Sequence, residues 1–315
     1  MHFFQNLSCS NLNAFFELVQ SWNLEFRQLD RGQFKGTLLQ YGFKGAQVGI
    51  TAVNRKFDQR GVAPGKLVSF AMLGPGSPPI IWRGVEIDHH KVMVYGAGDD
   101  IDCASEPGFN VMTYSISERR LSQLGRDFGI FQLEASLKRN KIVPISSRSM
   151  KFLQDTIVGT NRHVGPDGAG IDTKSVRCAL ETTIPRFILS AIAETQDLKI
   201  RSPLTKRRKQ ALAVIEQSLG SSPIPPTTVR ELCQLTRVSE RTLQYLFKQK
   251  YGLTPKAYLK LVRLNGVYRA LYKAGSQKAK IADLANEWGF WHMGQFAKDY
   301  KAQFGELPSD TLKTG

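Results

Sequence analysis

The spacing of apolar residues divides the chain into a β-like first part and a helical remainder. Between residues 24 and 117, short apolar runs alternate with Gly, Pro and Asp turns, which is typical of an antiparallel sandwich or barrel. Representative runs are 36–40, 47–53, 66–73, 80–87 and 91–95. Before them, residues 1–20 have the spacing of a short amphipathic helix, whose apolar face contains Leu12, Phe15, Phe16 and Val19.

After residue 117 the apolar spacing becomes helical. A first face with spacings of i, i+3, i+7 and i+10 contains Leu121, Leu124, Phe128 and Phe131. Further helices are predicted at 150–157 and 176–192, with a Gly- and Asp-rich loop at 159–173 between them. The second helix has an apolar stripe made of Leu180, Ile184, Ile188 and Ile192. This stripe either contacts a second protomer or packs on its own domain, and the spacing favours neither alternative.

The last third of the chain has a helical pattern throughout. Residues 198–209 are predicted to form a basic hinge into this region. A first helix follows, with an end at Gly220 and an apolar face that contains Leu212, Ile215 and Leu219. Residues 221–228 contain three prolines and are predicted to form a loop.

Two similar segments come next, and each predicts a helix-turn-helix unit. The pattern of 231–255 returns at 283–308, offset by 52 residues at first and by 53 after the turn. Thr228 and Ser239 are suitable helix N-caps, and Gly252 is a suitable helix end. Thr254-Pro255 starts a third helix that runs to about residue 273. This helix joins the first unit to the second, whose helices are predicted at 281–288 and 293–303.

In each unit one helical face must pack, and the opposite face is free to contact DNA. The packing face of the first unit contains Val229, Leu232, Cys233, Val238, Leu243 and Phe247, and its free face contains Glu240, Arg241, Gln244, Tyr245 and Lys248. The packing face of the second unit contains Ile281, Leu284, Ala285, Phe290, Phe296 and Tyr300, and its free face contains Trp291, His292, Met293, Gln295 and Lys298.

The free faces contain the side chains that DNA recognition needs. Arg can bond guanine, and Gln adenine, through two hydrogen bonds in the major groove. Lys248, Lys298 and Lys301 are better placed for phosphate contacts. A solvated helix face explains any single one of these residues equally well. Two units with matching free faces favour DNA binding.

The charge distribution points to the same kind of partner. The formal net charge is +16, of which +3 lies in residues 1–145, +2 in 146–202 and +11 in 203–315. A basic region on a chain that is otherwise close to neutral indicates a polyanionic partner such as nucleic acid. A basic surface that only keeps the protein soluble would explain the charge without such a partner.

The sequence offers little support for metal or catalytic chemistry. The four cysteines are far apart without ligand spacing, so we expect reduced, buried thiols and neither zinc nor a disulfide framework. His89-His90 is predicted in a turn, and no His-x-His with a following Glu is present. The Gly-rich segments 96–100 and 165–170 lack the Lys-Ser/Thr of a phosphate loop. No serine has a hydrolase motif around it. We therefore predict no catalytic residues, no metal and no cofactor.

Residues 203–313 resemble the DNA-binding domain of the AraC/XylS transcription regulators, in which one long helix joins two helix-turn-helix units. The matching residues are Glu231-Leu232-Cys233, Ser239, Leu243, Phe247-Lys248, Gly252, Pro255, Tyr258-Leu259, Arg263-Leu264, Ile281-Ala282-Asp283-Leu284-Ala285, Gly289-Phe290, Phe296, Tyr300-Lys301, Phe304-Gly305 and Pro308-Ser309. The resemblance implies base contacts by Arg241, Gln244 and Tyr245 in the first unit and by His292, Met293, Gln295 and Lys298 in the second.

Two positions depart from the pattern of the family, and one segment is similar to a branch of it. Cys233 stands where Ala is usual, and Trp291-His292-Met293-Gly294 replaces the small and polar residues that usually open the second recognition helix. The segment 288–296 is similar to the branch that contains the ethanolamine-utilisation regulator.

The resemblance implies an α+β protein with three parts. These are a cupin-like β-barrel for effector binding at 1–140, a helical dimerisation and linker region at 141–202, and the DNA-binding domain at 203–315. It further implies a cytoplasmic homodimer, more often an activator, that responds to a small-molecule effector and acts on RNA polymerase. The N-terminus lacks a secretory signal, and no apolar stretch is long enough for a membrane helix.

Two alternatives to this non-enzymatic regulator stay open at the level of sequence. One is a DNA-repair enzyme fused to the same kind of DNA-binding domain. Such an enzyme needs a zinc-bound cysteine cluster, which Cys9 and Cys103 do not form. The other is an architectural protein that binds DNA without sequence preference, mainly through phosphate charge.

Overall fold

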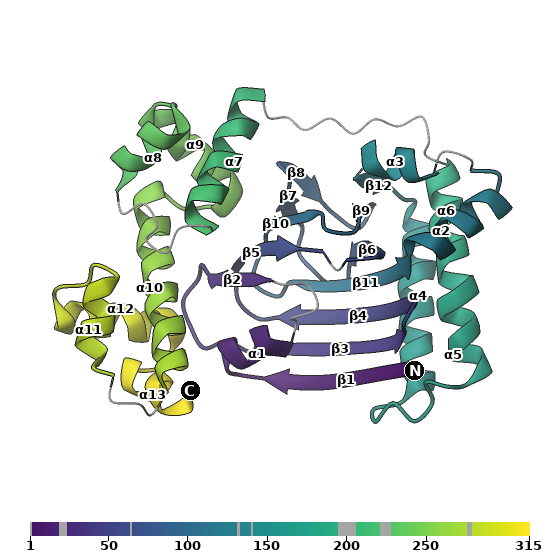
Figure 1. Cartoon of the computed structure of the whole chain (residues 1–315), viewed down its shortest axis with the longest axis horizontal. Coiled ribbons are helices and arrows are strands. Elements are labelled where there is room, and N and C mark those ends of the chain that lie inside the picture. The colour runs from purple at the N-terminus through teal and green to yellow at the C-terminus, as the bar shows by residue number, and fades with distance from the viewer. Residues whose placement is uncertain are drawn as a thin grey trace.

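The computed structural model describes residues 2–18, 24–63, 65–130, 133–139, 141–194, 206–220, 228–275 and 279–315. Its β-rich N-terminal part and its all-helical C-terminal part lie side by side (Figure 1). The predicted α+β class is therefore confirmed. The predicted loop at 221–228, except Thr228, and most of the predicted hinge at 198–209 lie outside the described residues.

The strands form two antiparallel sheets. The first has the order β1 (His2–Cys9), β3 (Gly36–Phe43), β4 (Ala46–Val53), β11 (Asn110–Ser117), β6 (Leu67–Leu73), β9 (Lys91–Tyr95) and β12 (Ile142–Pro144). The second has the order β2 (Glu25–Gln28), β5 (Phe57–Val62), β10 (Asp100–Ala104), β7 (Ile80–Trp82) and β8 (Val85–Ile87). Between β7 and β8, Arg83 and Gly84 both have positive φ, so the predicted single strand at 80–87 is a hairpin.

Two predictions for the N-terminal part need correction. A closed, cupin-like barrel is not found among the described residues. The edge strands of the first sheet, β1 and β12, lie at opposite ends and do not pair, and β5 and β10 pair with each other inside a separate second sheet. Residues 1–20 are not one helix, because His2–Cys9 pairs with β3 over its full length. Only α1 (Leu12–Leu18) is helical, with Leu12 and Phe15 in the core, and Val19 lies outside the described residues.

Helices cover one face of the first sheet (Figure 1). They are α2 (Glu118–Asp127), α3 (Leu133–Arg139), α4 (Ser147–Val164), α5 (Lys174–Cys178), a π-helical turn (Ala179–Thr183) and α6 (Ile184–Glu194). Because α4 continues to Val164, the predicted loop at 159–173 is shorter than expected. Phe128 ends α2 and is exposed, so it does not continue the predicted apolar face, while Phe131 lies outside the described residues.

The apolar stripe at 176–192 packs on its own domain. All four of its side chains are buried in the core beneath the first sheet, namely Leu180, Ile184, Ile188 and Ile192. The hydroxyl of Tyr114 on β11 donates a 2.7 Å hydrogen bond to the carbonyl of Leu180. These side chains are therefore not available to a second protomer, and the packing alternative is favoured.

The thiols are less buried than predicted. Cys103 is buried between the sheets, but Cys9 and Cys233 are partly exposed and Cys178 is exposed. Cys178 lies where α5 passes into the π-helical turn on the outer layer of helices, so its side chain has no core position to fill. In the part of the chain that the structure describes, no helix combines the length and apolar character needed to cross a membrane.

The C-terminal part contains α7 (Lys206–Gly220), α8 (Val229–Thr236), α9 (Glu240–Tyr251), α10 (Pro255–Ala274), α11 (Ile281–Glu287), α12 (Met293–Phe304) and α13 (Pro308–Thr314). Figure 1 shows α10 as the central helix, with α8 and α9 near one end and α11 and α12 towards the other. The predicted helices agree with these bounds to within one residue at most ends. Helix α13 was not predicted: Pro308 begins this helix as well as following the end of α12.

Candidate nucleic-acid interface

The first helix-turn-helix unit consists of α8 and α9, and its local signals act as predicted. The side chain of Thr228 accepts a hydrogen bond from the backbone N–H of Glu231, and that of Ser239 accepts one from Thr242. Each bond satisfies a backbone donor that the first helical turn leaves without a partner. Arg237, in the turn between the helices, has φ +51°. Gly252 ends α9 with φ +71°.

The second unit consists of α11 and α12 and has a different turn chemistry. Its N-cap positions are occupied by Lys280 and His292, and neither side chain forms a capping hydrogen bond. The left-handed position of the turn is held by Gly289, with φ +76°. It corresponds to Arg237 in the first unit at the offset of 52 residues. The two turns are therefore alike in backbone conformation and unlike in sequence.

Two glycines beside this turn should respond oppositely to replacement by alanine. Gly289→Ala places a side chain at φ +76°, which costs about 1–2 kcal/mol in the left-handed region. Gly294→Ala lies in α12, where an added Cβ meets no atom within 4 Å. It should raise the free energy of unfolding by about 0.4–1 kcal/mol, because it restricts the unfolded chain. Urea unfolding of the two variants measures both values, and shifts of the same sign would contradict the turn geometry.

The predicted packing faces are buried against α10. In the first unit Leu232, Leu243 and Phe247 are fully buried, and the Phe247 ring lies 5.3 Å from the Tyr258 ring of α10. In the second unit Ala285, Phe296 and Tyr300 are buried, and the Tyr300 ring lies 6.2 Å from the Tyr268 ring. Both units thus share one helix as a packing partner, which holds their recognition helices in a defined relation.

The predicted free face of α9 is exposed along its whole length. Its members are Glu240, Arg241, Gln244, Tyr245 and Lys248. The Gln244 amide donates to the Glu240 carboxylate at 3.3 Å, and the Lys248 ammonium donates to the carbonyl of Gly252 at 3.3 Å. These are exposed contacts within one turn of the helix. Exchanging them for contacts with DNA therefore costs little.

The predicted free face of the second unit is exposed with one exception. Trp291 is 73% exposed, and His292, Gln295, Lys298 and Lys301 are exposed as well. Met293 is partly buried and packs against the apolar cluster under α12. Its side chain is therefore less accessible than the prediction assumed. Lys260 of α10 forms a 2.7 Å ion pair with Asp299 on the adjacent flank of α12.

A buried polar network between the N-terminal sheet and α9–α10 was not predicted. The Asp58 carboxylate on β5 is fully buried and accepts hydrogen bonds from Arg60 Nε at 3.0 Å and from the Tyr258 hydroxyl. Arg60 also donates to the hydroxyls of Tyr251 and Tyr258, at 3.0 and 3.1 Å. Arg27 on β2 lies 3.6 Å from the same Asp58 oxygen. The network joins the second sheet to the first helix-turn-helix unit.

The ionisation of this network follows from burial and charge together. Burial disfavours the charged Arg60, but the neighbouring Asp58, Tyr258, Tyr251 and Asp102 outweigh it and raise the pKa of Arg60 well above its ordinary value. Burial raises the pKa of Tyr258, so its hydroxyl keeps the proton that it donates to Asp58.

Further polar contacts join both helix-turn-helix units to the same sheet. Lys250, near the end of α9, pairs with Asp102 of β10. Gln28 at the end of β2 exchanges hydrogen bonds with Gln303 of α12, at 2.8 and 3.0 Å. Its backbone also bonds the Asn265 side chain of α10, at 2.9 and 3.1 Å. Asp58 and Arg60 alternate with Phe57 and Gln59, which indicates a strand with both charged side chains on one face. No local signal identifies the residues that these side chains contact.

Comparison with known proteins agrees with this geometry. Residues 232–314 match the family model described as a helix-turn-helix domain. The XylDLEGF operon transcriptional activator of Pseudomonas putida is 37% identical over 86 residues, which cover 27% of this chain and 27% of that protein. The probable thc operon regulatory protein of Rhodococcus erythropolis is 37% identical over 89 residues, which cover 28% of this chain and 27% of that protein.

The chain thus spans only 27% of the length of these two relatives. Among solved structures, the AraC-like transcriptional activator CuxR matches with a TM-score of 0.46 and 15% identity, over 89% of this chain and 99% of that chain. Residues 232–314 therefore form a helix-turn-helix domain, and this part of the chain is similar to part of two operon regulators.

Proposed function

We propose that this protein is a sequence-specific DNA-binding transcription regulator of the AraC/XylS family, and not an enzyme. The observation that carries the proposal is the pair of helix-turn-helix units on α10, each with an exposed polar face on its recognition helix. The excess of basic residues after residue 202 supports it. We propose Arg241, Gln244, Tyr245, His292 and Gln295 as base-reading residues, with Lys248, Lys298 and Lys301 on phosphate.

We propose that the two recognition helices enter successive major grooves. Helix α10 has 20 residues, and a rise of 1.5 Å per residue makes it about 30 Å long. Successive major grooves on one side of B-DNA lie roughly 34 Å apart. The two lengths are close enough for one monomer to contact both grooves.

We propose that the N-terminal domain is a sensory domain that controls DNA binding. Alternate residues of β5 point to opposite faces of the sheet. Asp58 and Arg60 bond the DNA-binding domain, and Gln59 between them lines a cavity on the other side. Cys103 and Asp102 repeat this arrangement on β10. A ligand in the cavity is thus one residue away from the contacts that hold the recognition helices.

The finer features of the proposal follow the family. They are activation through RNA polymerase, a small-molecule effector, a homodimer, a cytoplasmic location, and closeness of residues 288–296 to the ethanolamine-regulator branch.

For the dimer contact within 141–202, Phe152 and Phe187 replace the buried stripe as candidates. Their rings stack with centroids 3.9 Å apart and are 42% and 37% exposed. Sedimentation of the Phe187→Ser variant tests this contact. A variant that is still a dimer would reject these two residues as the dimer contact.

Base reading is tested by comparing two exposed residues of α9 on the same duplexes. Arg241→Ala should weaken binding to the cognate site by about 1–3 kcal/mol and relax the preference at one or two base pairs. Lys248→Ala should weaken cognate and random duplexes equally and reduce the slope of affinity against salt. Competition titrations at matched salt measure both effects.

The same titrations separate the proposal from its alternatives. An equal loss on cognate and random DNA for Arg241→Ala would reject its assignment to base reading. A wild-type protein without preference for any genomic fragment would favour an architectural DNA binder. Zinc bound to the purified protein would favour the repair-enzyme alternative.

A further inference from the structure

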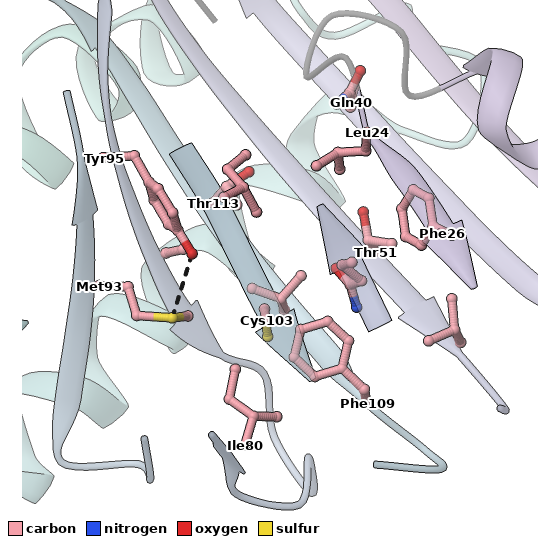
Figure 2. Close-up of a pocket in the computed structure, with 15 residues that line it drawn as sticks. Leu24, Phe26, Gln40, Thr51, Ile80, Met93, Tyr95, Cys103, Phe109 and Thr113 are labelled. Atoms are coloured by element: carbon pink, nitrogen blue, oxygen red, sulfur yellow. Dashed lines mark hydrogen bonds between the residues drawn. The ribbon is translucent and has the colours of Figure 1, made fainter. Parts of the chain in front are cut away.

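A cavity lies between the two sheets of the N-terminal domain (Figure 2). Its free volume is about 80 Å³. The second sheet contributes Phe26, Gln59 and Cys103, which are cross-strand neighbours on β2, β5 and β10. The facing sheet contributes Gln40, Thr51, Val53, Ala71, Met93, Tyr95, Val111 and Thr113. Since one water needs about 10–15 Å³ on the same measure, this space suits a molecule of about six non-hydrogen atoms, the size of a single ring.

The lining is uncharged. None of the described residues that line the cavity is Asp, Glu, Lys, Arg or His. Burial raises the pKa values of Tyr95 and Cys103, so both stay protonated near neutral pH. The Tyr95 hydroxyl is directed to the sulfur of Met93 at 3.7 Å, as Figure 2 shows. A carboxylate or ammonium group would lose its hydration here without gaining an opposite charge.

One polar group in the lining lacks a partner. Gln59 is only 8% exposed, and its buried side-chain nitrogen has no hydrogen-bond partner. A buried amide N–H without an acceptor costs about 1–3 kcal/mol. Its strand neighbours Asp58 and Arg60 are directed to the opposite face and bonded there. The unsatisfied donor therefore lies on the cavity side of β5.

A second opening lies between the domains, and it is less suited to a specific ligand. It is lined by Ile81, Arg83, Gly84, Asp100, Asp102, Leu212, Ala213, Leu246, Gln249 and Lys250. Three charged side chains of the described lining already have partners, because Lys250 pairs with Asp102 and Arg83 lies over the Trp82 ring. No described side chain in its lining has an unsatisfied buried polar atom. The cavity between the sheets is the better candidate.

We propose that the cavity between the sheets binds an uncharged, mainly apolar molecule whose carbonyl, ether or hydroxyl oxygen accepts a hydrogen bond from the Gln59 amide. This inference rests on the proposed sensory role of the N-terminal domain and names the class of its ligand. It excludes carboxylates, because no cation lines the described part of the cavity.

Three benzene derivatives of similar shape test this assignment on the full-length chain. They are acetophenone, isopropylbenzene and benzoate, and calorimetric titration measures the affinity of each. Acetophenone should bind about five- to tenfold more tightly than isopropylbenzene, which is the effect of one buried hydrogen bond. Benzoate should bind at least about tenfold more weakly than the ketone, because its charge is buried without a partner.

Two variants connect the result to the cavity. Gln59→Met keeps the length of the side chain and removes the donor, so it should abolish the preference for the ketone over isopropylbenzene. Thr51→Phe fills the cavity from the facing sheet and should weaken all three compounds. Circular dichroism confirms that each variant is folded.

Three results would overturn the inference: no binding of any compound, benzoate as tight as the ketone, or a ketone preference that persists in Gln59→Met. Duplex binding by the same preparations reports separately on the proposed regulator. Binding of DNA without binding of any compound would reject only the ligand assignment. Binding of the ketone without binding of DNA would reject the proposed function.

Discussion

Asp58→Asn should lower the free energy of unfolding by about 3–5 kcal/mol, the usual cost of removing one partner from a buried ion pair. The carboxylate is fully buried, with Arg60 Nε 3.0 Å and Arg27 Nη1 3.6 Å away. Asparagine has nearly the same size, so packing is preserved and the charge is removed. Two buried guanidinium groups then lose the anion that balances them. The Tyr258 hydroxyl also loses a charged acceptor.

Urea unfolding measures this loss, and a surface aspartate provides the control. Asp155 on α4 pairs with Lys151 at 3.5 Å, but its side chain is 65% exposed. Asp155→Asn should change stability by at most about 0.5 kcal/mol, as is usual for exposed pairs one helical turn apart. Equal effects of the two substitutions would show that the buried network contributes nothing.

Leu264→Pro should abolish binding to the full operator and leave, at most, one short protected patch. Leu264 lies in the middle of α10 and is 2% exposed. Proline there removes a backbone hydrogen bond and clashes with the preceding turn, which costs about 3 kcal/mol or more. The buried leucine side chain is lost as well, at a further cost of about 2–5 kcal/mol. The two recognition helices then lose their common support.

Leu264→Ala separates these two costs. It removes the same side chain and keeps α10 helical, so two protected patches about one helical turn of DNA apart should remain at a higher protein concentration. Hydroxyl-radical footprinting of the wild type and both variants tests the spacing. A single short patch in the wild-type footprint would contradict reading of two grooves by one monomer.

The C-terminal region was predictable from sequence because its signals are local. A Ser or Thr cap, a glycine in the left-handed region and Pro255 at a first helical position each act within about four residues. The structure places Thr228, Ser239 and Gly252 in these roles. Helical periodicity likewise separated Leu243 and Phe247, which are buried, from Arg241 and Gln244, which are exposed. Met293 is the exception, since the cluster that partly covers it is tertiary.

The N-terminal region was less predictable because strands are defined by partners distant in sequence. The apolar spacing at 12–19 led to the prediction of one helix over residues 1–20, yet pairing with β3 makes residues 2–9 a strand. Whether strands close into a barrel depends on which edges meet, and the spacing of apolar runs is the same for a barrel and for two facing sheets.

By itself, the sequence determined helices α8 to α12, the caps of the first helix-turn-helix unit, most of the exposed faces of both units and the basic charge around them. Only the tertiary structure decided where the stripe at 176–192 packs, which face of β5 lines the cavity and what holds the domains together. Asp58 and Tyr258 are 200 residues apart, and Gln28 and Gln303 are 275 apart. Nothing within a few residues of either partner distinguishes such a contact from a solvated polar side chain, because the burial that makes it strong exists only after the chain has folded.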